Sequence, residues 1–263
     1  MAVVSIPGWI GSSAANETGQ RLMFDARGVL RLPGTGWMSE MAGRSKEIEL
    51  TYGANHNLGY DWLVGVLASY GTIPVVVNIT GSWVAANTSG PCIYIPTSLQ
   101  NEYIKLVIHS GVMVSGRGGD GATAGSRYGK PGGIAITNEI GGRLHIYNYG
   151  SICGGGGGGG GVSLNSNIVS AGSGGRPFGL GGTGEGRDSQ SGYTASIDSP
   201  GATPPKTRFD SVGGVGGEVG SPGGNATFPY SSGTIEPPGA AGAAVNGNSP
   251  SWYVQGAIYG SRV

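Results

Sequence analysis

Regular patterns of hydrophobic and polar residues are concentrated in the first 115 residues of this 263-residue chain. A short helix is predicted within residues 58–70, because apolar side chains recur there at i, i+3, i+4 and i+7, at Leu63, Val66, Leu67 and Tyr70. Beyond it, short runs of β-branched and aromatic residues alternate with glycine and proline, which is typical of strands. We expect strands at residues 73–80, 82–86, 92–95 and 103–109.

Glycine dominates the rest of the chain. Residues 116–263 hold 42 of the 56 glycines and residues 1–115 hold 14, in a chain whose usual glycine share would be about 7 %. One run, residues 154–161, consists of glycine alone. This change of composition predicts two domains, residues 1–115 and residues 116–263.

The spacing of the glycines suggests how such tracts fold. Glycine recurs at every third position in places, as at Gly214, Gly217, Gly220 and Gly223, and three residues per turn is the period of polyproline II. That helix has no internal hydrogen bonds, so its buried peptide groups need partners on neighbouring helices. The expected fold class is a small mixed α/β N-terminal domain followed by a glycine-rich stack, or sandwich, of polyglycine II or polyproline II-type helices. We expect exposed loops and little regular helix or sheet in the C-terminal half.

Two other features bear on this expectation. A flexible linker is the alternative for glycine-rich sequence, but a linker rarely contains apolar residues such as Ile134, Ile146 and Phe178. A weak internal repeat relates residues 106–121 to the run that begins at residue 144, which would give units of strand, turn and glycine helix.

Charge and cysteine content exclude several classes of function. Lys+Arg and Asp+Glu both number 15, so the chain lacks the basic excess of a nucleic-acid-binding protein. No apolar run approaches the ~20 residues that span a bilayer, so we expect no membrane insertion. The N-terminus has no basic stretch and contains Pro7, which argues against a signal peptide. The two cysteines, Cys92 and Cys153, suit a reducing compartment.

Motifs of catalysis and cofactor binding are weak or missing. Residues 116–121 and 179–184 fit G-x-G-x-x-G, but chance matches are expected in so glycine-rich a sequence, and no amphipathic helix follows either. His56, His109 and His145 lack the spacing of metal ligands, and no G-x-S-x-G occurs. We therefore predict no catalytic site, no metal and no cofactor.

Segments rich in aromatic and small polar residues separate the glycine tracts. They span residues 122–130, 163–170, 187–210, 225–236 and 245–253. Rigid aromatics among adaptable polar residues are typical of antibody paratopes, and loops on a rigid scaffold often carry recognition. The alternative is solvated turns whose aromatics fold back on the scaffold. The candidate binding residues are Arg127, Tyr128, Asn165, Asn167, Arg187, Tyr193, Arg208, Phe209, Phe228, Tyr230, Asn248, Trp252 and Tyr253.

A second candidate surface lies near the N-terminus, where helix and strand patterns are weak. Large apolar residues occur there beside glycine and proline, namely Trp9, Ile10, Trp37, Met38 and Met41. They form either a local core or an apolar docking surface, since Trp and Met are favoured at interfaces.

Several motifs together give the chain a family resemblance. They are residues 1–11 (MAVVSIPGWIG), Ser115–Gly119, Gly129–Gly133, the octaglycine, Arg176–Gly179 and Pro237–Gly242. In the order in which they occur, over the whole chain, they resemble the receptor-recognising adhesins at the tip of the long tail fibre of T-even-type bacteriophages.

The resemblance implies partners and a location. An N-terminal domain would cap the tip of the trimeric long tail-fibre protein, so Trp9, Ile10, Trp37, Met38 and Met41 become candidate attachment residues. Loops at the far end of polyglycine II helices would bind a host outer-membrane protein or lipopolysaccharide. The protein would be made and assembled in the host cytoplasm and end in the virion. Two alternatives are a structural cap or assembly factor for the fibre tip, and a surface-associated hydrolase.

Overall fold

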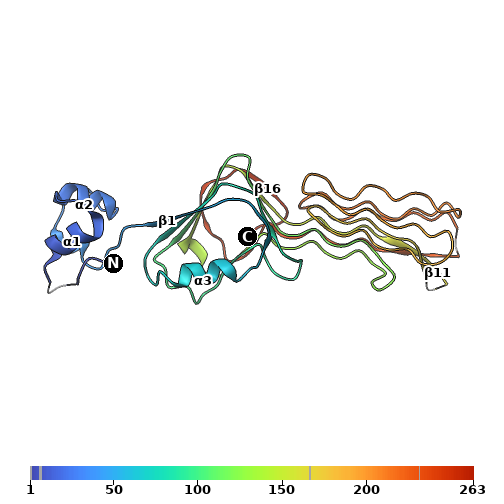
Figure 1. The fold of residues 1–263 in the computed structure, drawn as a ribbon, viewed down its shortest axis with the longest axis horizontal. Helices are drawn as coiled ribbons and strands as arrows, with labels where there is room; N and C mark the ends of the chain where they lie inside the picture. Colours follow the sequence, from blue (N-terminus) through green and yellow to red (C-terminus); the bar gives the residue numbers. More distant parts are fainter. Residues whose placement is uncertain (1, 6–7, 166, 231) are drawn as a thin grey trace.

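The computed structural model describes residues 2–5, 8–165, 167–230 and 232–263. These residues form an elongated molecule with three parts in a row (Figure 1). A small helical segment lies at one end, a group of sheets in the middle, and a bundle of extended glycine-rich tracts reaches to the other end near β11. The C-terminus lies with the sheets in the middle of the molecule.

The helical segment, which comprises the described residues up to 42, has its own small core. It contains α1 (Ile10–Thr18), α2 (Met23–Val29) and the 3-10 turn η1 (Met38–Met41). α1 ends at Gly19, whose φ of 73° is the left-handed conformation that glycine adopts readily at a helix C-terminus. The buried residues that pack together are Val3, Ala14, Ala26, Leu30 and Met41.

In the middle part the chain winds repeatedly through three parallel sheets. The first sheet has the order β1-β3-β6-β9-β15, the second β16-β10-β7-β4-β2, and the third β14-β8-β5. Their bounds are β1 (Ile48–Tyr52), β2 (Asn55–Leu58), β3 (Val75–Ile79), β4 (Trp83–Ala85), β5 (Ile93–Ile95), β6 (Ile104–Ile108), β7 (Met113–Ser115), β8 (Ile136–Asn138), β9 (Leu144–Asn148), β10 (Ser151–Cys153), β14 (Val245–Gly247), β15 (Ser251–Val254) and β16 (Ala257–Tyr259).

This order makes the middle part a parallel solenoid, because β3 to β10 belong to the first, second and third sheet in turn and β14, β15 and β16 continue the series. In the first coil α3 lies between β2 and β3, where the later coils have a strand of the third sheet. Alternate residues of β6 and β9 face inward and are buried, and Ile104 pairs with Leu144 in register. The inward residues of all three sheets join one apolar core. The short helix α3 (Trp62–Ala68) adds Leu63 and Leu67 to that core, as the helical spacing in this region predicts.

The glycine-rich sequence leaves this solenoid twice. It departs after β7 and returns at β8, then departs after β10 and returns at β14. The second excursion carries a three-stranded antiparallel sheet of order β12-β11-β13, made of β11 (Gly161–Leu164), β12 (Asn167–Ser170) and β13 (Thr234–Glu236).

The predicted fold class is therefore wrong. The chain is an α/β fold with sheets of three to five strands, and β8 to β16 all lie after residue 115, where we expected a stack of polyglycine II helices with little sheet. Strands from both sides of residue 115 pair in the same sheets, as β6 does with β9. The high average glycine content concealed short strands such as Leu144–Asn148, whose buried and half-buried positions alternate.

Candidate functional site

The glycine tracts are held together by backbone hydrogen bonds from one tract to the next. Gly119 donates its N–H to the carbonyl of Gly156 at 2.8 Å, and Gly175 donates to Gly119 at 2.8 Å. A Cβ on Gly158 would collide with the backbone of Asp120, and most glycines of these tracts meet a neighbouring backbone in the same way. Glycine is required here because any side chain would push the two backbones apart.

The direction of each tract follows from these bonds. Residues 116–122 and 153–159 run side by side in the same direction, since Gly116, Gly119 and Ala122 donate to carbonyls spaced alike along the second tract. Residues 129–133 run back, because Lys130 bonds to Asp120 and Gly133 to Arg117. The connection between an outgoing and a returning tract must therefore lie at the far end. By the same bonds five connections lie there: residues 123–128, 161–171, 183–189, 203–212 and 225–236.

We call these five connections the far-end loops; the structure describes them apart from residues 166 and 231. They contact one another. Arg208 pairs with Asp188 at 3.2 Å between two loops, and the Ser163 hydroxyl donates to Glu236 at 2.6 Å between two others. Because the loops support one another, they present one connected surface (near β11 in Figure 1).

A shallow hollow of about 460 Å³ opens between two far-end loops. Tyr230, 56 % exposed, meets Phe228 edge to face at 5.6 Å between ring centres. Lys206 and Asp210 form an ion pair at 3.5 Å beside these rings. The hollow thus offers aromatic surface, a donor and an acceptor, and it is lined by Lys206, Asp210, Val212, Thr227, Phe228, Pro229 and Tyr230.

Nine of the thirteen predicted binding residues lie in the far-end loops. They are Arg127, Tyr128, Asn165, Asn167, Arg187, Arg208, Phe209, Phe228 and Tyr230. Tyr193 is 48 % exposed but lies on a returning tract, where its carbonyl accepts from Gly174 at 2.9 Å.

The other three predicted binding residues belong to the solenoid. Trp252 pairs with Ile146 in the first sheet, and Tyr253 stacks on Tyr147 with ring centres 4.8 Å apart. Asn248 donates its backbone N–H to the carbonyl of Asn138 at 2.6 Å. The structure therefore does not bring Asn248, Trp252 and Tyr253 together with the far-end loops, because their segment forms β14 and β15.

The opposite end of the molecule carries an apolar face. Trp9 is 88 % exposed, Trp37 is 80 % exposed and Met38 is also exposed. Met41 is fully buried in the core of the helical segment, and Ile10 packs partly buried against it. Three of the five predicted residues are thus surface residues, and two belong to the local core that was the alternative interpretation.

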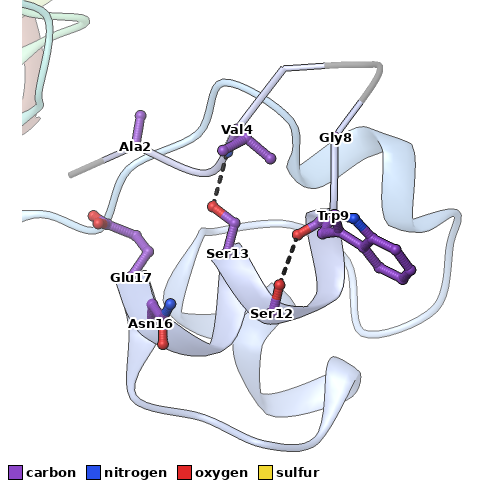
Figure 2. Close-up of a pocket in the computed structure, with 8 residues that line it drawn as sticks. All are labelled: Ala2, Val4, Gly8, Trp9, Ser12, Ser13, Asn16 and Glu17. Atoms are coloured by element: carbon purple, nitrogen blue, oxygen red, sulfur yellow. Dashed lines mark hydrogen bonds between the residues drawn. The ribbon is translucent and has the colours of Figure 1, made fainter.

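Figure 2 shows a hollow of about 440 Å³ in the helical segment, which shares only Trp9 with these exposed apolar residues. The Ser13 hydroxyl accepts a hydrogen bond from the N–H of Val4 at 2.9 Å, and the Ser12 hydroxyl donates to the carbonyl of Trp9 at 3.1 Å. The indole of Trp9 projects away from Ser13, Asn16 and Glu17 (Figure 2). The hollow is lined by Ala2, Val4, Gly8, Trp9, Ser12, Ser13, Asn16 and Glu17.

Sequence reasoning missed three further members of the apolar face, Leu22, Met23 and Phe24, of which Leu22 and Phe24 are about two-thirds exposed. The sequence did indicate that some of these side chains are exposed, because three consecutive large apolar residues cannot all face the core from a helix with 3.6 residues per turn. We use the name apolar face for the exposed large apolar residues of this end of the helical segment taken together, Trp9, Leu22, Met23, Phe24, Trp37 and Met38.

Both cysteines and one histidine, His145, lie in the middle part of the molecule. Burial raises the pKa of the Cys153 thiol to about 11, and that of Cys92 further, so both thiols stay protonated. His145 lies stacked on Tyr103 with ring centres 4.8 Å apart. Among the described residues no group of His, Cys, Asp and Glu has the arrangement of a metal site, and none of their helices is long and apolar enough to cross a membrane.

A solenoid that carries a connected loop surface at one end and an apolar face at the other has the form of a binding protein with two opposite ends. The comparisons with known proteins give this class a family. Residues 47–263 match the phage tail fibre adhesin Gp38, and residues 1–42 match the N-terminal domain of the same adhesin. The chain belongs to the Gp38 family of phage tail fibre adhesins.

Two relatives cover nearly the whole chain. The receptor-recognizing protein gp38 of Salmonella phage S16 is 41 % identical over 255 residues, which are 96 % of this chain and 97 % of the relative. The crystal structure of the gp37–gp38 adhesin tip complex of the bacteriophage S16 long tail fibre contains a similar chain. The two chains are 40 % identical and superpose with a TM-score of 0.80, and the match covers 100 % of both.

Proposed function

We propose that this adhesin is carried at the tip of a long tail fibre and binds a host outer-membrane receptor through its far-end loops, thereby setting host range. The single observation that carries the proposal is the separation of the two surfaces: the far-end loops and the apolar face lie at opposite ends of an elongated molecule (Figure 1). A protein that joins a fibre to a cell needs two such surfaces.

The proposed attachment surface is the apolar face of the helical segment. Exposed Trp and Met side chains are enriched at protein interfaces, and an apolar patch on so small a unit is characteristic of an interaction site. The similar S16 chain was solved in complex with gp37, so the proposed partner is the trimeric fibre protein. We assign attachment to the N-terminal part, within residues 1–115, and receptor binding to residues 116–263.

The proposed receptor surface consists of exposed aromatics within a rim of polar groups. Tyr128 and Tyr230 are more than half exposed, and aromatic residues dominate the affinity of many interfaces. Arg208 and Lys206 are paired with acidic residues, so a broad electrostatic attraction does not drive binding. This surface suits extracellular porin loops or the sugars of lipopolysaccharide, without catalysis.

The second candidate function is a purely structural cap or assembly factor for the fibre tip. The large apolar face favours a role on the fibre, and such a cap would not need the far-end loops. The two functions differ in one measurable property, because only an adhesin binds intact host cells and competes with phage.

Exchange of loops tests the proposal. Residues 187–210 and 225–236 are replaced by those of a relative that infects another host, and infection of both hosts is measured. The matched control exchanges only residues 196–200 of the first segment, a turn at the solenoid side, where Arg176 donates to the carbonyl of Ile197 at 2.6 Å. We expect host range to follow the first exchange and not the second. A folded, fibre-bound chimera that keeps its original host range contradicts the proposal.

A further inference from the structure

The buried guanidinium of Arg27 organises the loop that displays Trp37. Arg27 lies on the last turn of α2, and its side chain is fully buried. Its Nε donates to the carbonyl of Pro33 at 2.6 Å, and its Nη1 donates to the carbonyl of Trp37 at 2.9 Å. One Nη2 group donates both to the carbonyl of Thr35 at 3.0 Å and to the Glu40 carboxylate at 2.6 Å.

These bonds replace regular structure in residues 33–37. The loop is neither helix nor strand, so its carbonyls have no ladder partners and depend on other donors. The planar fork of arginine reaches three of them at once, which the point charge of lysine cannot do. Glu40 compensates the buried positive charge, and the hydrogen bond from Arg27 lowers the pKa of Glu40.

Neighbouring residues pack closely around the guanidinium of Arg27. Gly36 lies so close that a Cβ on it would collide with the Arg27 Nη2 and with the Glu40 carboxylate. The next residue but one, Met38, reaches to Gly11 on α1, where an added Cβ would lie 3.0 Å from its Cε. The loop is therefore fixed on both sides, while the indole of Trp37 remains 80 % exposed.

We propose that Arg27 is a positioning residue for fibre attachment, which acts by holding the backbone of Trp37 in its binding conformation before the fibre is met. This inference rests on the proposed attachment function of the apolar face. A backbone held in place before binding loses less conformational freedom when the side chain it carries docks, so the affinity is higher.

The test measures binding of the full chain to the purified trimeric fibre tip. Arg27→Lys keeps the charge opposite Glu40 but loses the fork, and we expect its affinity to fall about tenfold. Glu40→Gln keeps the carbonyl bonds and should bind within about twofold of the original protein. If Arg27 mattered only as a counter-charge, Arg27→Lys would bind normally and Glu40→Gln would not, which overturns the proposal.

A second readout follows the indole itself. With 5-fluorotryptophan incorporated, the ¹⁹F resonance of Trp37, assigned from Trp37→Phe, should shift toward the unfolded position in Arg27→Lys. An unchanged resonance overturns the proposal.

A second variant tests the proposal if Arg27→Lys unfolds the helical segment. Gly36→Ala leaves Arg27 in place but puts a methyl group against its guanidinium from the side of the loop, so we expect weaker binding to the fibre tip. Its matched control is Gly43→Ala, a position that also has a positive φ but where an added Cβ meets nothing within 4 Å. Equal binding of these two variants overturns the proposal.

Trp37→Ala distinguishes a failure of the proposed attachment surface from a failure of the proposed role of Arg27. If Trp37→Ala binds the fibre tip as well as the original protein does, the proposed attachment surface is wrong. If Trp37→Ala binds weakly while Arg27→Lys binds normally, attachment stands and the role of Arg27 fails.

Discussion

Replacement of Gly157 by alanine should destabilise the glycine-rich tracts although it adds a single methyl group. Gly157 donates its N–H to the carbonyl of Ser221 at 3.0 Å, and its own carbonyl accepts from Gly217 at 2.8 Å. A Cβ at this position would collide with the carbonyl of Gly239 and lie 2.8 Å from that of Ala240. The neighbouring backbone has to move, since it has no flexible side chain that could give way.

The magnitude follows from the hydrogen bonds that such a movement strains. Two are those of Gly157 itself, and a third joins Gly239 to Gly158 at 2.8 Å. At about 1–1.5 kcal/mol each, the loss of all three costs about 3–4.5 kcal/mol. Alanine also restricts the unfolded chain, which offsets up to about 1 kcal/mol. We expect a net destabilisation of about 3 kcal/mol.

Hydrogen exchange and urea denaturation measure this effect. The amides of residues 154–161 should lose protection in Gly157→Ala, and the urea midpoint should fall. The matched control is Gly125→Ala in a far-end loop, where a Cβ meets nothing within 4 Å, so its stability should change by less than about 0.5 kcal/mol. Equal stability of the two variants would refute the reasoning, because it would show that the tracts have room for side chains.

Three further predictions concern the two ends and the solenoid. Trp9→Ala and Trp37→Ala should each weaken fibre attachment about tenfold or more in a pull-down with the fibre tip, because exposed tryptophans are frequent hot spots. Tyr230→Ala should lower the affinity for host cells by about 2 kcal/mol, about thirtyfold, in a cell-binding titration. Burial, and then the charge of Lys105, lower the pKa of His145 below its ordinary 6.5. The unfolded chain therefore binds this proton more readily, and stability should fall as the pH drops below about 6.5. His145→Gln should weaken that pH dependence in thermal unfolding.

The two binding predictions have controls on the same molecule. Leu180 is 55 % exposed on a glycine tract, so Leu180→Ala should leave fibre attachment unchanged. Tyr149 is 54 % exposed between β9 and β10, so Tyr149→Ala should leave cell binding unchanged. Loss of binding in a control variant equal to that in its test variant would contradict the assignment of the surface. An unchanged pH profile in His145→Gln would contradict the assignment of the titration.

The helix and several strands of the first half could be predicted from the sequence, because the apolar residues that face the core recur there at the regular spacing of a helix or a strand. Leu63 and Leu67 do lie on a helix, and the runs around Val77 and Leu106 are strands. The helices α1 and α2 were missed because their apolar residues are divided between a small core and an exposed face.

The winding of the solenoid could not be predicted from the pattern of residues along the sequence. Its coils differ in length: Val75 pairs with Ile104 in one turn and Ile104 with Leu144 in the next, so no fixed period exists. The weak repeat nevertheless related residues of β6 and β9, which are neighbours in the first sheet. Composition indicated segments that overlap the far-end loops, but it took residues 187–210 as one segment, whereas residues 190–202 lie between two of the loops. The segment that contains Trp252 has a similar composition and is a strand.

The bonds between the glycine tracts have a consequence for how this protein can evolve. They join peptide groups to peptide groups, and the glycines contribute no side chains, so the scaffold is largely indifferent to the identity of residues in the connections. A far-end loop such as residues 183–189 can gain, lose or exchange residues without compensating changes in the tracts that carry it. If the far-end loops bind the receptor as proposed, adaptation to a new surface requires few simultaneous mutations, and inheritance of short loop segments would move the whole particle from one bacterial lineage to another.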